Sequence, residues 1–298
     1  MTSKLVSAVR SVSLNVPDLV RAEEFYTRIW HLDVVARSDD AIYLRGTGPP
    51  HHLLSLHRGE QTEIRDVTFR ARTADALAII GDAATRAGGS VVRPLGPISE
   101  PGKGIGVTVR DPDGRVFRVI HGDAVHAGGA DVRDRPIRLA HVVLNSHDVA
   151  ATQSFFEAVF GFTLVDRTRI MAFLNCDRDH HTVALGDASE DSLNHIAFVM
   201  PDLESVMRGG GRMKDAGHPI EWGPGRHGPG ANAFNYFIDP FGIVIEYTSE
   251  IEQIDDTYKV GGPDDWKWPP GRVDHWGISA PPSARLKEAQ KKIFFAAA

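Results

Sequence analysis

Residues 11–18, with the sequence SVSLNVPD, return 130 positions later as residues 141–148, HVVLNSHD. Two further stretches repeat in the same order at nearly the same spacing: HHLLSL at 51–56 with HHTVAL at 180–185, and DPDGRVFR at 111–118 with DPFGIVIE at 239–246. Chance similarity does not preserve both order and spacing over three stretches. The pattern therefore indicates a duplicated domain.

Each copy divides once more. In the first copy an alternating apolar run, 9–16, precedes an amphipathic stretch, 18–29, for which the carboxylate of Asp18 is a suitable cap. The later segments repeat this order, with strands expected at 41–44, 53–56, 67–70, 106–110 and 116–120, a helix at 74–87 ended by Gly88 and Gly89, and a turn at 111–114. The sequence thus predicts an α+β fold in which a strand, a helix and about three strands occur four times.

The length of 298 residues agrees with two domains. We expect a first domain at 1–125, a linker rich in Gly, Asp and Arg at 126–136, and a second domain at 137–250. A tail at 251–298 matches neither copy, and we expect it to pack on the second domain.

Composition excludes several classes of protein. The net charge of −6 and the lack of long basic runs argue against nucleic acid or an anionic membrane as a partner. The sequence contains no stretch of about 18 apolar residues, so we expect no transmembrane helix. The N-terminal residues lack the continuous apolar core of a secretory signal peptide. The single cysteine, Cys176, fits a structural role in a reducing cytoplasm.

Three residues of the second copy suggest a metal centre. His141, His195 and Glu246 fall on equivalent strands of the repeat, the first two at expected strand starts. Two imidazoles and one carboxylate leave about three adjacent coordination positions open, which suits non-haem Fe(II) or Mn(II). Taken alone, each of these side chains could instead be a capping or surface group that binds no metal.

The aligned residues of the first copy are Ser11, Asp66 and Arg118. Arginine would place a positive charge at the metal position, so this copy cannot hold a divalent cation well. We therefore expect one active domain and one that serves as scaffold.

The motif GPGRHGPG at 223–230, followed by FNYFIDPFG at 234–242 and Glu246-Tyr247, resembles type I extradiol ring-cleaving dioxygenases of the vicinal oxygen chelate superfamily. The resemblance covers roughly residues 9–250. It implies two modules per domain, each pair curling into an open barrel, with the first barrel free of metal.

The resemblance also implies residue roles. His141, His195 and Glu246 would be the metal ligands, and His181, Tyr236 and His227 the catalytic side chains. The implied reaction inserts both atoms of O2 into a catechol, with His181 as acid or base and Tyr236 and His227 as hydrogen-bonding groups. Successive strand residues face opposite sides, so only one of His180 and His181 can point inward. The resemblance implies an active-site histidine on the strand before the second ligand, and His181, fourteen residues before His195, fits that place. The resemblance further implies a homo-oligomer.

Several points stay open at this stage. Phe173, Trp222 and Phe234 could stack on the substrate ring or pack in the core, and Arg272 could bind a substrate carboxylate or lie on the surface. Asn145, which has a counterpart in Asn15, is interpreted as structural. The alternative functions are a metal-dependent isomerase or epimerase of the same superfamily, and a metal-free protein that binds a small molecule. The identity of the catechol and the choice between iron and manganese are not specified by the sequence.

Overall fold

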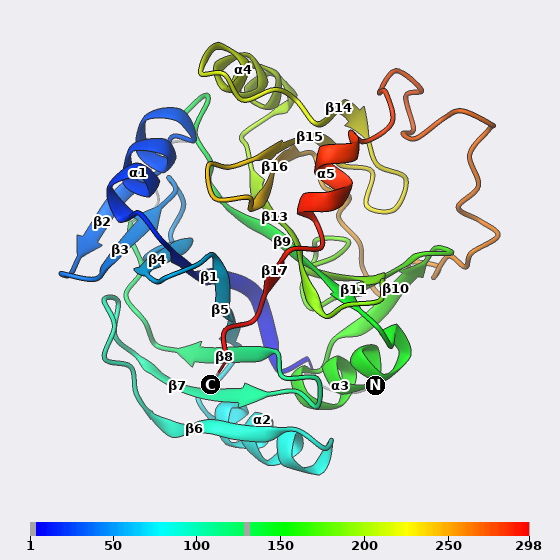
Figure 1. Cartoon of the computed structure of the whole chain (residues 1–298). Helices are drawn as coiled ribbons and strands as arrows, with labels where there is room; N and C mark the ends of the chain where they lie inside the picture. Colours follow the sequence, from blue (N-terminus) through cyan, green and yellow to red (C-terminus); the bar gives the residue numbers. More distant parts are fainter. Residues whose placement is uncertain (1–3, 128–131, 298) are drawn as a thin grey trace.

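The computed structural model describes residues 4–127 and 132–297, and each copy of the repeat forms one mixed sheet (Figure 1). The first sheet has the order β2-β3-β4-β1-β5-β8-β7-β6. Its elements are β1 (Val6–Val16), α1 (Leu19–Glu24), η1 (Phe25–Ile29), β2 (Asp33–Arg37), β3 (Ala41–Arg45), β4 (Leu54–Arg58), β5 (Glu63–Ala71), α2 (Asp75–Arg86), β6 (Ser90–Pro97), β7 (Ile105–Arg110) and β8 (Val116–His121).

The second sheet repeats this order as β10-β11-β12-β9-β13-β16-β15-β14. Its elements are β9 (Arg138–Ser146), α3 (Val149–Phe160), β10 (Thr163–Arg167), β11 (Met171–Asn175), β12 (Val183–Asp187), β13 (Ser192–Val199), α4 (Leu203–Asp215), β14 (Trp222–Arg226), β15 (Ala233–Ile238) and β16 (Val244–Ser249). The chain therefore contains four βαβββ modules, two in each half, as the repeat predicted.

Strand register confirms the alignment of the two copies. Val12 pairs with Leu54 in the first sheet, and the aligned Val142 pairs with Val183 in the second. Where β5 pairs with β8, and β13 with β16, aligned residues again occupy matching positions. The backbones around Arg118 and Glu246 are consequently equivalent, and only the side chains differ.

The first helix departs from the sequence-based expectation. The amphipathic stretch 18–29 was expected to form one helix, capped by Asp18. Asp18 does accept a hydrogen bond from the Arg21 N–H at 3.0 Å, but the α-helix ends at Glu24 and residues 25–29 form a wider π-helical turn. A π turn adds one residue to a helical turn and keeps the apolar face of the helix continuous, so the pattern of apolar residues does not distinguish it from an α-helix.

Reciprocal contacts join the halves. Tyr26 of the first half donates a hydrogen bond to Asp239, in the turn between β15 and β16, at 2.8 Å. On the other side Arg115, in the turn between β7 and β8, donates to Thr152 of α3 at 3.1 Å. The ring of Trp30 stacks on that of Tyr247 with centroids 3.6 Å apart. The helix of each half thus supports a turn of the other.

The tail contacts both sheets. After α5 (Ala284–Ala289), β17 (Ile293–Phe294) pairs with β13, and Phe295 then bridges to Ile64 of β5. Figure 1 shows this last segment running from α5 down to the C-terminus beside β8. Residues 128–131 of the expected linker lie outside the described part. Among the described helices, none has the length and hydropathy that crossing a membrane requires.

Candidate metal centre

Three neighbouring strands bring His141, His195 and Glu246 together. Nε2 of each histidine lies 3.2 Å from Oε2 of Glu246, and the two Nε2 atoms are 3.4 Å apart. Strand geometry explains this convergence: Ala197 of the central strand β13 pairs with His141 on one side and Glu246 on the other, and His195 lies two residues from Ala197 on the same face. The expectation that the two histidines begin their strands was wrong. They occupy the fourth position of β9 and of β13.

Burial and hydrogen bonding give these donors the charge states that a cation needs. Glu246 is fully buried, which raises its pKa, but the imidazoles of His141, His195 and His227, which face its oxygens, outweigh burial and hold the pKa well below its usual value. Burial lowers the pKa of His195 to about 4, even though Glu246 opposes this shift. At neutral pH the trio therefore presents a carboxylate and a neutral His195.

An amide network orients His195. Its Nδ1 lies 2.8 Å from Oδ1 of Asn194, which also accepts a hydrogen bond from Gln290 of the tail. Asn194 in turn donates to Asn145 at 2.9 Å, and Asn145 donates to Gln290 O and Ser192 Oγ. Such partners fix the ring of a coordinating histidine and leave its other nitrogen free.

Three further side chains surround the trio. The ring of His181 lies 4.3 Å from that of His141, whereas His180 points away toward Asp166. The hydroxyl of Tyr236 lies 3.0 Å from His227 Nε2 and 3.4 Å from His195 Nε2. The two adjacent histidines precede β12 rather than lie in it, so loop geometry and not strand alternation separates their directions.

These neighbours carry protonation states suited to proton transfer. Burial lowers the pKa of His181 well below its usual value, with help from His141, His180 and His227. Burial also raises the pKa of Tyr236, and the nearby Glu246 carboxylate adds to this effect. His181 is therefore a neutral imidazole, and Tyr236 keeps its hydroxyl proton.

Three of the four expected pocket residues lie beside this group. Phe173 contacts His181 edge-on, with ring centroids 5.1 Å apart. Trp222 and Phe234 pack against one another at 4.4 Å, and Phe234 stacks on His227 at 4.0 Å. Arg272 lies on an exposed turn of the tail, and no contact joins it to the trio in the described part of the chain.

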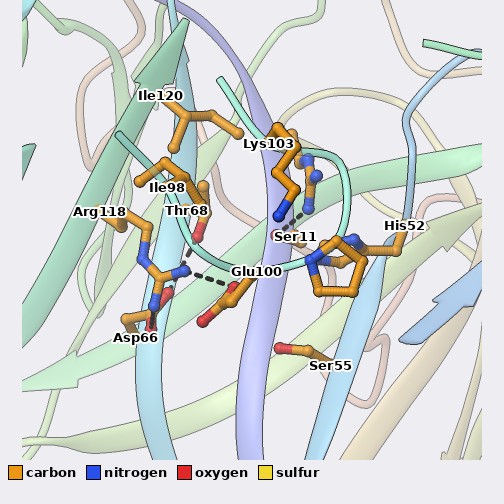
Figure 2. Close-up of a pocket in the computed structure, with 12 residues that line it drawn as sticks. Ser11, His52, Ser55, Asp66, Thr68, Ile98, Glu100, Lys103, Arg118 and Ile120 are labelled. Atoms are coloured by element: carbon orange, nitrogen blue, oxygen red, sulfur yellow. Dashed lines mark hydrogen bonds and ion pairs between the residues drawn. The ribbon is translucent and has the colours of Figure 1, made fainter. Parts of the chain in front are cut away.

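The first half places a guanidinium where the second places Glu246 (Figure 2). Arg118 donates hydrogen bonds to Asp66 at 2.8 Å and to Glu100 at 2.6 Å. Burial lowers the pKa of Arg118, but these carboxylates outweigh burial and raise it. The enclosed cavity here measures about 10 Å³, which is room for roughly one water molecule.

Sequence reasoning missed the residues that support the trio. Asn194 and Gln290 orient His195, and Asn232 donates to Glu246 Oε1 at 3.4 Å. Asn194 could have been found from the sequence, because it is adjacent to the candidate ligand His195. Gln290 and Asn232 lie too far in sequence from the side chains they support, Asn194 and Glu246, for a local pattern to reveal them. Cys176 is buried, and its thiol donates to Thr182 Oγ1 at 3.3 Å.

Comparison with known proteins assigns the family. A model described as the Glyoxalase/Bleomycin resistance protein/Dioxygenase superfamily matches residues 8–119 and 138–247. Metapyrocatechase 2 of Cupriavidus necator is 28% identical, over 93% of this chain and 90% of its own length. The manganese-dependent 2,3-dihydroxybiphenyl 1,2-dioxygenase of Geobacillus genomosp. 3 is 22% identical, over 77% of this chain and 80% of its own.

A solved structure agrees with this assignment. The Mn(II)-bound glyoxalase from Novosphingobium aromaticivorans is similar with a TM-score of 0.88 and 32% identity, covering 95% of this chain and 94% of that one. The matched ranges include β9, β13 and the part of β16 that carries Glu246, and they span most of both halves. The chain therefore belongs to the Glyoxalase/Bleomycin resistance protein/Dioxygenase superfamily.

Proposed function

We propose that this protein is a metal-dependent extradiol dioxygenase, which opens a catechol ring beside its two hydroxyls and adds both atoms of O2 to the product. The observation that carries the proposal is the convergence of His141, His195 and Glu246, with His181 and Tyr236 beside them. The names of Metapyrocatechase 2 and of the 2,3-dihydroxybiphenyl dioxygenase, two relatives of this chain, support the same reaction class.

The trio fits a divalent cation. Its donor atoms all lie within 4.8 Å of one another, and all three residues are buried. Nδ1 of His141 has no hydrogen-bond partner among the described residues, while Nε2 of this imidazole faces both Glu246 Oε2 and His195 Nε2. A buried carboxylate between two imidazoles, with no lysine or arginine bound to it in the described part, is a charge arrangement that a cation would balance.

A bound Fe(II) or Mn(II) ion would act as a Lewis acid toward the catechol hydroxyls and as the redox partner of O2. The donor set suits both metals. The resemblance to extradiol dioxygenases implies iron, whereas the names of the manganese-dependent relative and of the Mn(II)-bound structure support manganese. We propose iron, with manganese as the second metal to be tested.

The surrounding side chains have distinct tasks. His181, as a neutral imidazole beside His141, accepts the proton of a catechol hydroxyl and returns it later in the reaction. Tyr236 retains its proton and donates a hydrogen bond to an oxygen of the substrate or intermediate. His227 supports that hydroxyl from 3.0 Å away, and Phe173 and Trp222 provide apolar walls.

The test is O2 consumption. The purified protein is loaded with Fe(II) or Mn(II) without air, and a panel of single-ring, biaryl and carboxylated catechols is then added with oxygen. We expect O2 uptake equal to the catechol consumed, and a yellow ring-opened semialdehyde. If the loaded protein consumes no O2 with any member of the panel, the dioxygenase proposal is wrong.

A second candidate is a metal-dependent isomerase. It is favoured by the 32% identical Mn(II)-bound structure, which is named a glyoxalase. Isomerases of this kind tend to use a fourth protein ligand, commonly a glutamate, while the metal-capable group at this point has three members in the described part of the chain. An isomerase needs no O2. Conversion of a glutathione hemithioacetal without air would favour it over the dioxygenase.

A further inference from the structure

A buried carboxylate lies behind the candidate catalytic histidine. Oδ2 of Asp166, on β10, is 2.7 Å from Nε2 of His180, and both side chains are fully buried. The hydroxyl of Tyr258, from the tail, donates to the same oxygen at 3.0 Å, and the Gly261 N–H donates to Oδ1 at 2.7 Å. A segment of the tail, about 90 residues away in sequence, therefore contacts the Asp166–His180 pair through Tyr258 and Gly261.

The pair is connected to the metal centre through His181. Nδ1 of His180 lies 3.1 Å from Nδ1 of His181, whose ring lies 4.3 Å from that of His141. In the described part of the chain, Nε2 of His181 makes no hydrogen bond. A continuous chain of hydrogen bonds thus runs from Asp166 through His180 to the side chain that faces the trio.

The chemistry of the three groups sets the direction of these bonds. Oδ2 of Asp166 accepts the hydroxyl proton of Tyr258, and a carboxylate oxygen accepts hydrogen bonds, so the ring proton of His180 is on Nε2 and is donated to Asp166. Nδ1 of His180 then carries a lone pair, and it accepts the Nδ1 proton of His181. Nε2 of His181 is consequently the nitrogen with the free lone pair.

The first domain provides an internal comparison. His51 and His52 reproduce the adjacent pair, with their Nδ1 atoms 3.0 Å apart. Strand register aligns Asp166 with Ala36, since Asp166 pairs with Phe173 just as Ala36 pairs with Tyr43. The fold therefore keeps the two histidines without the carboxylate, and the carboxylate occurs in the domain that contains the trio.

We propose that Asp166 and His180 are positioning residues, which hold His181 as the tautomer protonated on Nδ1 so that its Nε2 can accept the catechol proton. This inference rests on the proposed function. In the step concerned, the substrate O–H bond breaks and an N–H bond forms at His181 Nε2. The positive charge that then develops on His181 faces His180, and behind it the anionic Asp166.

The first test reads the tautomer without any activity. Full-length protein with ¹⁵N-labelled histidine is studied metal-free and with diamagnetic Zn(II), and long-range ¹H–¹⁵N spectra identify the protonated nitrogen of each ring. Comparison with His180→Gln and His181→Gln assigns the signals. We expect His181 protonated on Nδ1 and His180 on Nε2. A His181 ring that carries its proton on Nε2 in the wild-type protein would overturn the inference.

The second test separates positioning from support of the fold. With metal content unchanged, Asp166→Asn should lower kcat by about 10–100-fold and leave KM nearly constant. The matched control is His51→Gln, which removes the equivalent contact in the first domain and should change neither kcat nor the His181 signal. If Asp166→Asn folds, keeps kcat and keeps the wild-type tautomer, the inference is wrong. If Asp166→Asn does not fold, the ¹⁵N spectrum of the wild-type protein still shows which tautomer His181 adopts and so tests the inference.

The two proposals fail in different ways. Absence of O2 uptake by the loaded wild-type protein contradicts the dioxygenase and leaves the tautomer measurement to stand alone. Normal O2 uptake together with a His181 protonated on Nε2 contradicts the positioning role of Asp166 and His180 while the dioxygenase remains.

Discussion

At the scale of single residues, the neighbours of Glu246 set its charge. A fully buried glutamate would ordinarily favour the protonated form, but its oxygens face His141, His195 and His227, and these lower its pKa well below the usual value. Burial acts in the opposite sense on His195, because it disfavours the charged imidazole and so lowers the pKa of this side chain. Anionic oxygen and neutral nitrogen are the states that bind a divalent metal.

The first prediction concerns His181. Replacement by glutamine keeps a polar side chain but removes the imidazole that exchanges a proton near neutrality. We expect kcat to fall by about 100–10,000-fold, with one metal ion still bound per chain, because His181 is not a member of the trio. Steady-state O2 uptake and elemental analysis of the same sample check this. Loss of the metal in His181→Gln would contradict the assigned division of roles.

The second prediction concerns Asn194. Replacement by alanine removes the acceptor at 2.8 Å from His195 Nδ1 and frees the ring to rotate. We expect metal affinity to fall by about 10–100-fold, as measured by competition with a chelator of known affinity. Gln61→Ala, an exposed change in the first domain, is the control. Equal metal affinities in Asn194→Ala and the control would show that the amide network does not support the centre.

At the scale of elements, equivalent strands of the two domains carry different charged groups: the His141, His195 and Glu246 trio in the second domain and Arg118 with its carboxylates in the first. Tyr236 and Glu246 are cross-strand partners in the hairpin of β15 and β16, which explains the ten-residue spacing in the sequence. In the first domain the strand equivalent to β16 carries Arg118, and its charge meets Asp66 and Glu100 rather than a metal. A guanidinium held by carboxylates provides the positive charge at this point of the first domain.

The third prediction tests that replacement. Arg118→Met should leave Asp66 and Glu100 largely buried and without their cation, and the free energy of unfolding should fall by about 3 kcal/mol. Denaturant titration at pH 7 measures the change. Arg65→Met, which removes an exposed guanidinium in the same sheet, should alter the free energy of unfolding by less than about 0.5 kcal/mol. If Arg118→Met also changes the free energy of unfolding by less than about 0.5 kcal/mol, Arg118 is not the cation on which Asp66 and Glu100 depend. Loss of metal from the second domain in Arg118→Met would contradict the separate roles of the two centres.

At the scale of the whole molecule, the two domains hold one another through turns and helices. Asp239 lies in the turn between β15 and β16, accepts the N–H groups of Phe241 and Ile243, and receives the hydroxyl of Tyr26 across the interface. Burial raises the pKa of Asp239 to about 6 in spite of these hydrogen bonds. The domain contact therefore contains a group that titrates in mildly acidic solution.

The fourth prediction follows from this shift. Between about pH 4 and pH 6 the folded protein keeps the proton on Asp239 while the unfolded chain, with an ordinary pKa of 3.8, has released it. Unfolding then releases a proton, so the contribution of Asp239 to stability decreases as pH rises through this window. Asp239→Asn cannot titrate. Its free energy of unfolding relative to wild type should increase by about 2 kcal/mol from pH 4 to pH 7.

Denaturant titrations of both proteins at each pH measure the difference, in which the other titrating groups cancel. A difference that stays constant from pH 4 to pH 7 would show that Asp239 titrates alike in the folded and unfolded states.

The sequence by itself determined the duplication, the four modules and the choice of His141, His195 and Glu246 as candidate metal ligands, because periodicity and internal alignment are properties of local order along the chain. It also distinguished the two copies, since Arg118 cannot replace a metal ligand. The supporting network was decided only by tertiary structure. Gln290 reaches His195 through Asn194, and Tyr258 reaches Asp166, across about a hundred residues each. No local pattern encodes contacts that form when the tail folds back on the sheet, so packing alone brought those side chains together.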